Sequence, residues 1–118
     1  MERDPRAFLW DAREAADTIA EFTQGLDAER YRLNPLVRSA VERQFEIIGE
    51  ALNQLSRVAP DVAQHVPRLP EIVGFRNLLI HGYSKIDHEL VWDKVANLLP
   101  DLRRILDELL SDSGSAEA

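Results

Sequence analysis

Hydrophobic residues recur along much of this chain at intervals of three and four, the spacing of one face of an α-helix. Three long segments follow this pattern, and no segment is convincing as a strand. The three stripes are Phe8, Ala12, Ala15, Ile19, Phe22 and Leu26; Val37, Val41, Phe45, Ile48, Leu52 and Leu55; and Val91, Val95, Leu98, Leu102, Ile105 and Leu109. The pattern predicts three long amphipathic helices.

Local signals mark the ends of the first two helices. Asp4-Pro5 and Asn34-Pro35 each place a capping residue before a proline, an arrangement that suits the first turn of a helix. Gly25 is a stop signal for the first helix, and Pro60 should end the second.

The second half of the chain contains a connector and two further helices. Residues 60–70, PDVAQHVPRLP, hold three prolines and are expected to form a connector with one short helical turn at most. A shorter helix should run from about Glu71 to Gly82. Asp87 then caps the last long helix, whose apolar phase continues across Pro100. We therefore expect one kinked helix there, not two separate ones.

These elements predict an all-α, up-and-down bundle of four to five helices over residues 1–110. The remaining residues 111–118, SDSGSAEA, are small and polar and are expected to form a disordered tail. Leu36, Ala40, Ile47 and Ala51 widen the apolar stripe of the second helix to about half of its circumference. A stripe of that width favours burial on two sides, as in a bundle that also forms a homodimer.

The composition and charge of the chain limit the classes of protein to which it could belong. The 118 residues suit one domain, and the absence of cysteine excludes disulfides and thiolate metal sites. No apolar run approaches the ~20 residues that span a bilayer, and MERDPRAFLW lacks the pattern of a signal peptide. A cytoplasmic protein without membrane contact is expected. The net charge of −7 argues against a broad electrostatic grip on nucleic acid, although it allows a local basic site.

The segment RNLLIHGY, residues 76–83, carries four polar or ionisable side chains in a leucine-rich helix. Asn77 and His81 are four residues apart and share a helix face. Arg76 and His81 are five apart, so their directions differ by roughly 140° in a regular helix. One copy of the chain is thus poorly suited to grip one atom with both groups, whereas two copies across a two-fold axis could do so.

The chemistry of these residue types is coherent. Histidine moves protons near neutral pH, arginine clamps a phosphate, and asparagine can orient an imidazole or bind an oxygen. No carboxylate cluster lies nearby in the sequence, so we expect neither a metal nor a cofactor. This combination fits metal-independent cleavage of RNA. Such residues near a helix end could instead be surface or C-cap contacts, and spacing alone favours that plainer interpretation.

Similarity over a longer part of the sequence favours the catalytic interpretation over the plainer one. RNLLIHGY resembles the R-x-x-x-x-H-x-Y signature of the HepT-like family of HEPN-domain toxins. ERQFEIIGEAL, residues 42–52, is similar to the second-helix segment of that family. IVGFRNLLIHGYSKID, residues 72–87, followed by Val91-Trp92, is similar to its motif and the start of its next helix. The likeness extends over about residues 4–110.

The resemblance implies a homodimeric helical bundle that acts as an RNA-cleaving toxin of a two-gene, type VII toxin–antitoxin system. It implies that Arg76 and His81 carry the cleavage, with Asn77 as their polar neighbour. The antitoxin would be a small nucleotidyltransferase of the MntA type, which silences the toxin by adding AMP to the motif tyrosine, here Tyr83. The alternative is a non-catalytic helical partner of a nucleotidyltransferase.

Several neighbouring residues remain open to two interpretations. Glu50 could position Arg76 from the adjoining helix or could be a salt-bridged surface residue. Gly49 could permit close approach of two helices. Leu78 and Leu79 are expected to supply packing near a two-fold site. His65 and His88 are expected to be solvated.

Overall fold

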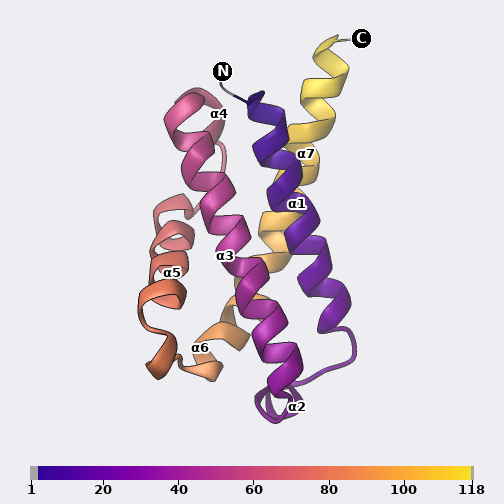
Figure 1. Ribbon diagram of the computed structural model, residues 1–118. Helices are drawn as coiled ribbons and strands as arrows, with labels where there is room; N and C mark the ends of the chain where they lie inside the picture. The colour runs from indigo at the N-terminus through magenta and orange to yellow at the C-terminus, as the bar shows by residue number, and fades with distance from the viewer. Residues whose placement is uncertain (1–2, 118) are drawn as a thin grey trace.

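The computed structural model describes residues 3–117 as a bundle of helices (Figure 1). Helix α1, Pro5–Phe22, packs beside the long helix α3, Pro35–Val58. Helix α5, Leu69–His81, packs against α3, and α7, Leu99–Glu117, packs against α1. The shorter elements are α2, Ala28–Arg32; α4, Pro60–Ala63; the 3₁₀ turn η1, Tyr83–Lys85; α6, His88–Asp93; and the π-helical segment η2, Lys94–Leu98.

The all-α bundle that the sequence predicts is confirmed, and residues 3–117 contain no strand. The helical segments outnumber the expected four to five because α2 and α4 are single short turns beside the main helices. Within the described residues, no helix combines the length and apolar character needed to cross a membrane. The expected tail at residues 111–118 begins inside α7, whose backbone continues to Glu117, and the boundary between domain and tail stays a prediction.

The predicted helix starts are confirmed by their capping hydrogen bonds. The side chains of Asp4, Asn34 and Asp87 each accept from a backbone N–H two or three residues later, at 2.9, 3.1 and 2.9 Å. Each bond satisfies an N–H that the first turn of a helix leaves without an intrahelical partner. Gly25 has a φ of 78°, a left-handed conformation that glycine adopts without strain, and it turns the chain just after α1.

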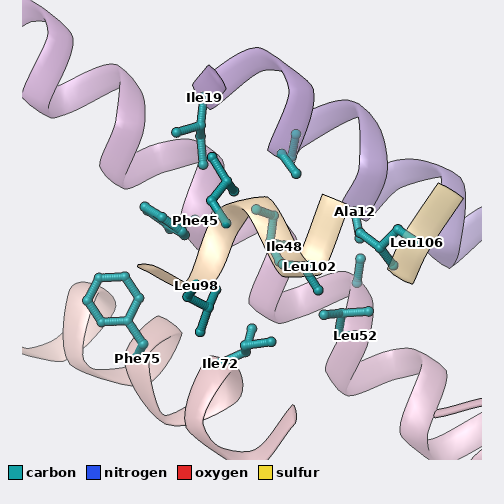
Figure 2. Close-up of a cluster of buried hydrophobic side chains, with 14 of the residues drawn as sticks. Ala12, Ile19, Phe45, Ile48, Leu52, Ile72, Phe75, Leu98, Leu102 and Leu106 are labelled. Carbon is teal, nitrogen blue, oxygen red and sulfur yellow. The ribbon is translucent and has the colours of Figure 1, made fainter. Parts of the chain in front are cut away.

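The core lies where α1, α3, α5 and α7 face one another, as the side chains in Figure 2 show. The stripe of α3 is buried as predicted, from Val41 to Leu55. The wide stripe of this helix is covered by α1 and by α5 within one chain. Ala51 is buried and Ile47 is half-buried, whereas Leu36 at the start of the helix is 80% exposed.

The last helix departs from the predicted stripe after Leu102. Leu106 and Leu110 are buried, whereas the predicted Ile105 and Leu109 are only half-buried. In the π segment the backbone N–H of Leu99 donates to the carbonyl of Lys94, five residues earlier, directly before Pro100. This wider turn shifts the register of the residues that follow by about one position. The helix therefore continues without a break past a proline that cannot donate a backbone hydrogen bond.

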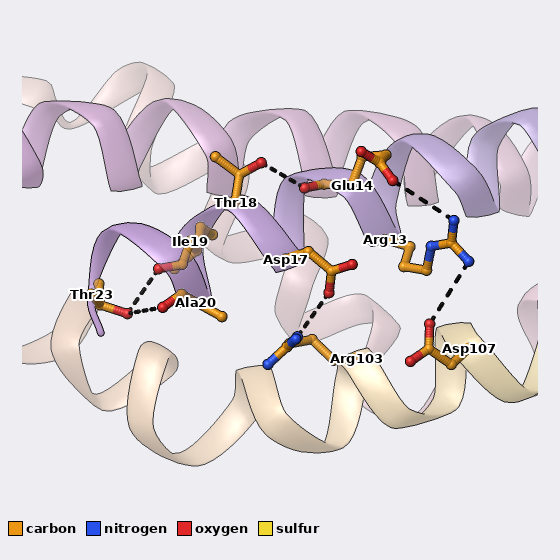
Figure 3. Close-up of polar contacts among 9 residues, drawn as sticks. All are labelled: Arg13, Glu14, Asp17, Thr18, Ile19, Ala20, Thr23, Arg103 and Asp107. Carbon is orange, nitrogen blue, oxygen red and sulfur yellow. Dashed lines mark hydrogen bonds and ion pairs between the residues drawn. The ribbon is translucent and has the colours of Figure 1, made fainter. Parts of the chain in front are cut away.

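Polar pairs link α1 to α7 on the outside of the core (Figure 3). Arg103 Nε donates to Asp17 Oδ1 at 2.9 Å, and Arg13 lies 3.9 Å from Asp107. Such exposed pairs contribute little stability, so we assign them to alignment of the two helices. Phe22 was predicted to be part of the apolar stripe, but it is 41% exposed because α1 ends there.

Candidate functional site

The candidate site begins with a close approach of α3 and α5 at Gly49. A Cβ atom added to Gly49 would lie 2.2 Å from Cβ and 2.7 Å from Cγ of Arg76. These distances leave no room for a side chain, so glycine is required for the observed spacing of the two helices. The sequence left open whether Gly49 permits close helix approach, and the structure shows that it does.

Arg76 is held beside Gly49 by a chain of hydrogen bonds. Its Nη2 donates to Glu50 Oε2 at 2.5 Å, and its Nη1 donates to Asn77 Oδ1 at 2.9 Å. Gln54 Nε2 donates at 3.1 Å to the other carboxylate oxygen of Glu50. Glu50 therefore does contact Arg76 from the adjoining helix, which decides the alternative that the sequence left open.

The Arg76 guanidinium keeps hydrogen-bonding capacity after these contacts. Its side chain is 24% exposed, and each Nη carries a second hydrogen. The Nε atom is buried and has no hydrogen-bond partner among the described residues. A guanidinium fixed in position with free N–H groups is suited to binding a phosphate oxygen.

A cavity of about 520 Å³ opens beside Arg76 where α1, α3 and α5 meet. Its apolar wall is formed by Phe8, Ile47, Ala51 and Ile80. Its charged lining consists of Arg3, Arg43 and Arg76 with Asp11, Glu46 and Glu50. The cavity therefore brings three cations together beside three carboxylates, in a chain whose net charge is −7.

His81 is the last residue of α5 and is exposed. It makes no hydrogen bond or ion pair with any residue that the structure describes, and it is absent from the lining of the cavity beside Arg76. Asn77 and Leu78 are exposed on the same outward face, Leu78 to 44%. Leu79 is buried in the core of its own chain, and the expectation that it supplies packing near a two-fold site stays a prediction.

The helix that carries the motif ends directly after His81. The backbone N–H of Gly82 donates to the carbonyl of Leu78 at 2.7 Å, and a Cβ at Gly82 would lie 2.8 Å from that oxygen. Tyr83 follows as the first residue of the η1 turn, two positions after His81. The C-cap glycine thus brings the backbone of Tyr83 next to the end of α5.

Both His65 and His88 were expected to be solvated. His65 is exposed as expected, whereas His88 is half-buried. The His88 ring contacts the Arg38 guanidinium, and its Nδ1 is buried without a described partner. Burial and the charge of Arg38 lower the pKa of His88. This contact lies between α3 and α6 and is separate from Arg76.

Most of the cavity lining was not expected from the sequence. Arg43 and Ile80 lie within the family-like segments but were not expected as site residues, and Gln54 lies outside those segments. The packing of α5 against α3 brings Arg43 and Gln54 into the same lining as Arg76. The spacing of four between Arg76 and Ile80 was the available signal, because it places them on one helix face. Within the described part of the chain, no three histidine or carboxylate side chains gather in a way that could hold a metal ion.

Comparisons with known proteins identify relatives that match most of the chain. A family model described as "Ribonuclease HepT-like" matches residues 12–109. A Methanocaldococcus jannaschii protein whose name gives it as an RNase candidate is 39% identical over 105 residues, which cover 87% of this chain and 94% of that protein. A Thermococcus cleftensis protein named "Probable ribonuclease HepT" is 32% identical over 111 residues, covering 92% and 98%.

No solved structure matches the chain significantly. The family model nevertheless spans α1 from Ala12, α3, the whole of the Arg76–Tyr83 motif and most of α7. Both relatives are covered over nearly their full length, and both are more than 30% identical. The chain therefore belongs to the HepT-like family of ribonucleases.

Proposed function

We propose that this HepT-like ribonuclease is a metal-independent endoribonuclease that acts as the toxin of a type VII toxin–antitoxin system. His81 takes the proton from a ribose 2′-hydroxyl, and the resulting oxygen attacks the adjacent phosphorus. The bond from phosphorus to the 5′-oxygen breaks, and that oxygen receives a proton from the His81 imidazolium, which returns the ring to its neutral form. The products are a 2′,3′-cyclic phosphate and a 5′-hydroxyl end, and no water is consumed in this step.

The observation that carries the proposal is the held guanidinium of Arg76 at a cavity wall, on the helix that ends with an exposed His81. Arg76 binds the phosphate and stabilises the charge that develops on its oxygens. Glu50 and Asn77 fix the direction of the guanidinium before substrate arrives. This preorganisation lowers the cost of reaching a productive geometry.

We further propose that the working site is formed by two copies of the chain. Arg76 lines the cavity and His81 faces outward, which agrees with the roughly 140° between these positions in a helix. A two-fold axis near the exposed face of Asn77, Leu78 and His81 would present His81 of one copy to Arg76 of the other. Leu78, at 44% exposure, supplies apolar contact area for such an interface.

Regulation would act on Tyr83. A cognate nucleotidyltransferase antitoxin adds AMP to this tyrosine, and the new phosphate occupies the cationic site and excludes RNA. The position of Tyr83 in the turn directly after α5 supports this proposal, because its backbone lies two residues beyond His81. A Tyr83→Phe variant should resist silencing while it retains RNA cleavage.

The central test is expression of the wild type and of the Arg76→Ala and His81→Ala variants, with the ends of cellular RNA mapped. Wild type should slow growth and produce cyclic phosphate ends, and both variants should lose these effects. His65→Ala removes an exposed imidazole from the connector and is the matched control, which should behave as wild type. The purified protein should cleave RNA in the presence of a chelator.

Two results would contradict the proposal. If wild type and variants behave alike, the nuclease assignment of these residues fails. A protein that binds nucleotides, leaves RNA intact and is harmless on expression would instead be a non-catalytic partner of the nucleotidyltransferase.

A further inference from the structure

Among the three cations that line the cavity, Arg43 differs in having no hydrogen-bond or ion-pair partner within the described part of the chain. Arg3 donates to Asp11 at 2.8 Å and lies over the Phe8 ring, 4.8 Å from its centroid. Arg76 is paired with Glu50. Arg43 lines the same cavity, is exposed, and makes no hydrogen bond or ion pair with any described residue. Although three carboxylates also line the cavity, none of them is paired with Arg43, so Arg43 can bind an anion without first breaking a contact.

The spacing along α3 between Arg43 and Glu50, which contacts Arg76, indicates which kind of anion could bind at both arginines. Arg43 and Glu50 are seven residues apart on α3, which corresponds to two turns on one face and about 10 Å along the axis. Because Glu50 holds Arg76, the α3 positions that bear Arg43 and the Arg76 contact lie two helical turns apart beside the cavity. An axial separation of about 10 Å suits two phosphates of one strand, one at each guanidinium.

Apolar side chains also line the cavity beside these cations. Ile47 lies one turn from Arg43 on the same helix face, and Ile80 lies one turn from Arg76 on α5. Single-stranded nucleic acid is commonly bound by cations that follow the backbone beside apolar surface that contacts the bases. The cavity combines cations and apolar side chains in one lining.

The geometry points to a second phosphate subsite at Arg43, so that a single RNA strand lies along α3 with one phosphate at Arg76 and a neighbouring phosphate at Arg43. This inference rests on the proposed function, because RNA is the ligand. Arg43 is a substrate-positioning residue here and takes no part in the chemical step. It should affect binding of the strand and leave the rate of the bound complex unchanged.

The test uses the full chain and a fluorescent single-stranded RNA in which every 2′-hydroxyl is methylated, so that binding is measured without cleavage. Arg43→Gln should weaken binding about tenfold, and the slope of log affinity against log salt should become shallower by about 0.7, the loss of one phosphate contact. Arg57→Gln is the matched control, because Arg57 is an exposed cation on α3 outside the cavity. It should stay within about twofold of wild type.

Two further measurements separate the outcomes. Arg43→Lys keeps the charge and should retain the wild-type salt slope. With cleavable RNA, Arg43→Gln should raise KM and leave kcat unchanged.

If Arg43→Gln and Arg57→Gln weaken binding equally while wild type cleaves RNA, the subsite is wrong and the nuclease stands. If wild type binds the methylated strand through Arg43 but leaves natural RNA intact, the subsite stands and the nuclease fails. If the wild-type protein binds no RNA, the strand-binding subsite is wrong. It is also wrong if Arg43→Gln weakens the binding of AMP as much as the binding of the RNA strand.

Discussion

Gly49 determines how closely α3 and α5 approach beside Arg76. The two atoms that an added Cβ would meet, at 2.2 and 2.7 Å, belong to the base of the Arg76 side chain. Cβ cannot move away, because the backbone of α5 fixes its position, whereas Cγ could move only by rotation about the Cα–Cβ bond. A side chain at position 49 would therefore push the helices apart and stretch the contact between Glu50 and Arg76.

The first prediction is that Gly49→Ala destabilises the fold, although alanine is the better helix former. Overpacking in a close contact costs about 1–3 kcal/mol, which exceeds the ~1 kcal/mol that alanine gains over glycine in a helix. Urea unfolding should give a lower free energy of unfolding, and RNA cleavage should fall with it.

Gly74→Ala is the control for this prediction. The substitution is the same, the position is also helical, and an added Cβ would meet no atom within 4 Å. It should raise the free energy of unfolding by about 0.4–1 kcal/mol. Shifts of the same sign in both variants would contradict a tight contact at Gly49.

The start of α5 is tied to the π segment by a three-residue ionic cluster. Arg68 Nε donates to Glu71 Oε2 at 2.6 Å, and Lys94 Nζ donates to Glu71 Oε1 at 2.5 Å. The hydrogen bonds from Arg68 and Lys94 lower the pKa of Glu71 to about 2. Lys94 is itself almost fully buried, so this carboxylate satisfies a charge inside the bundle.

The second prediction concerns acid. Because the pKa of Glu71 is lower in the folded chain than its ordinary value of 4.5, the folded state favours the carboxylate. The cluster thus stabilises the fold above pH 4.5, and this contribution is lost as the pH falls from 4.5 towards 2. Glu71→Gln should reduce the free energy of unfolding at pH 6, and its difference from wild type should shrink by pH 2. A difference that stays constant over this range would contradict the assignment.

The boundaries of the helices could be predicted because their signals are local. Asp4 and Asn34 cap the turns that follow them, so neighbouring sequence alone specifies the contact. The shift from Ile105 to Leu106 could not be predicted. It depends on a π turn that accommodates Pro100, and this turn leaves no mark in the hydrophobic spacing.

The candidate site was predictable only in part for a related reason. The motif identifies Arg76 and His81, because their spacing lies within one helix. The contact of Arg76 with Glu50, and the place of Arg43 in the same cavity, depend on how α5 docks against α3. Residues 26 or more apart in sequence meet there, and helical periodicity does not specify which of them face one another.

Across the molecule, one chain separates the two groups that the proposed reaction needs. The Arg76 guanidinium faces the cavity between α1, α3 and α5, whereas His81 is exposed at the end of α5 and does not line that cavity. If the reaction requires both groups at one phosphate, a second copy must supply one of them. Sedimentation of the purified protein should then give the mass of a dimer, and Leu78→Asp should yield a folded monomer that does not cleave RNA.

The last prediction tests whether two subunits share each site. Co-expression of the Arg76→Ala and His81→Ala chains with different tags allows the mixed dimer to be purified. In that dimer one site lacks both groups, and the other combines Arg76 of one chain with His81 of its partner. The mixed dimer should therefore recover about half of the wild-type rate, although each parent is inactive. A mixed dimer of the Arg76→Ala chain and the Arg76→Ala/His81→Ala chain should show no RNA cleavage, because neither chain carries Arg76. An inactive mixed dimer would show that both groups act within one chain, and the two-fold site would have to be abandoned.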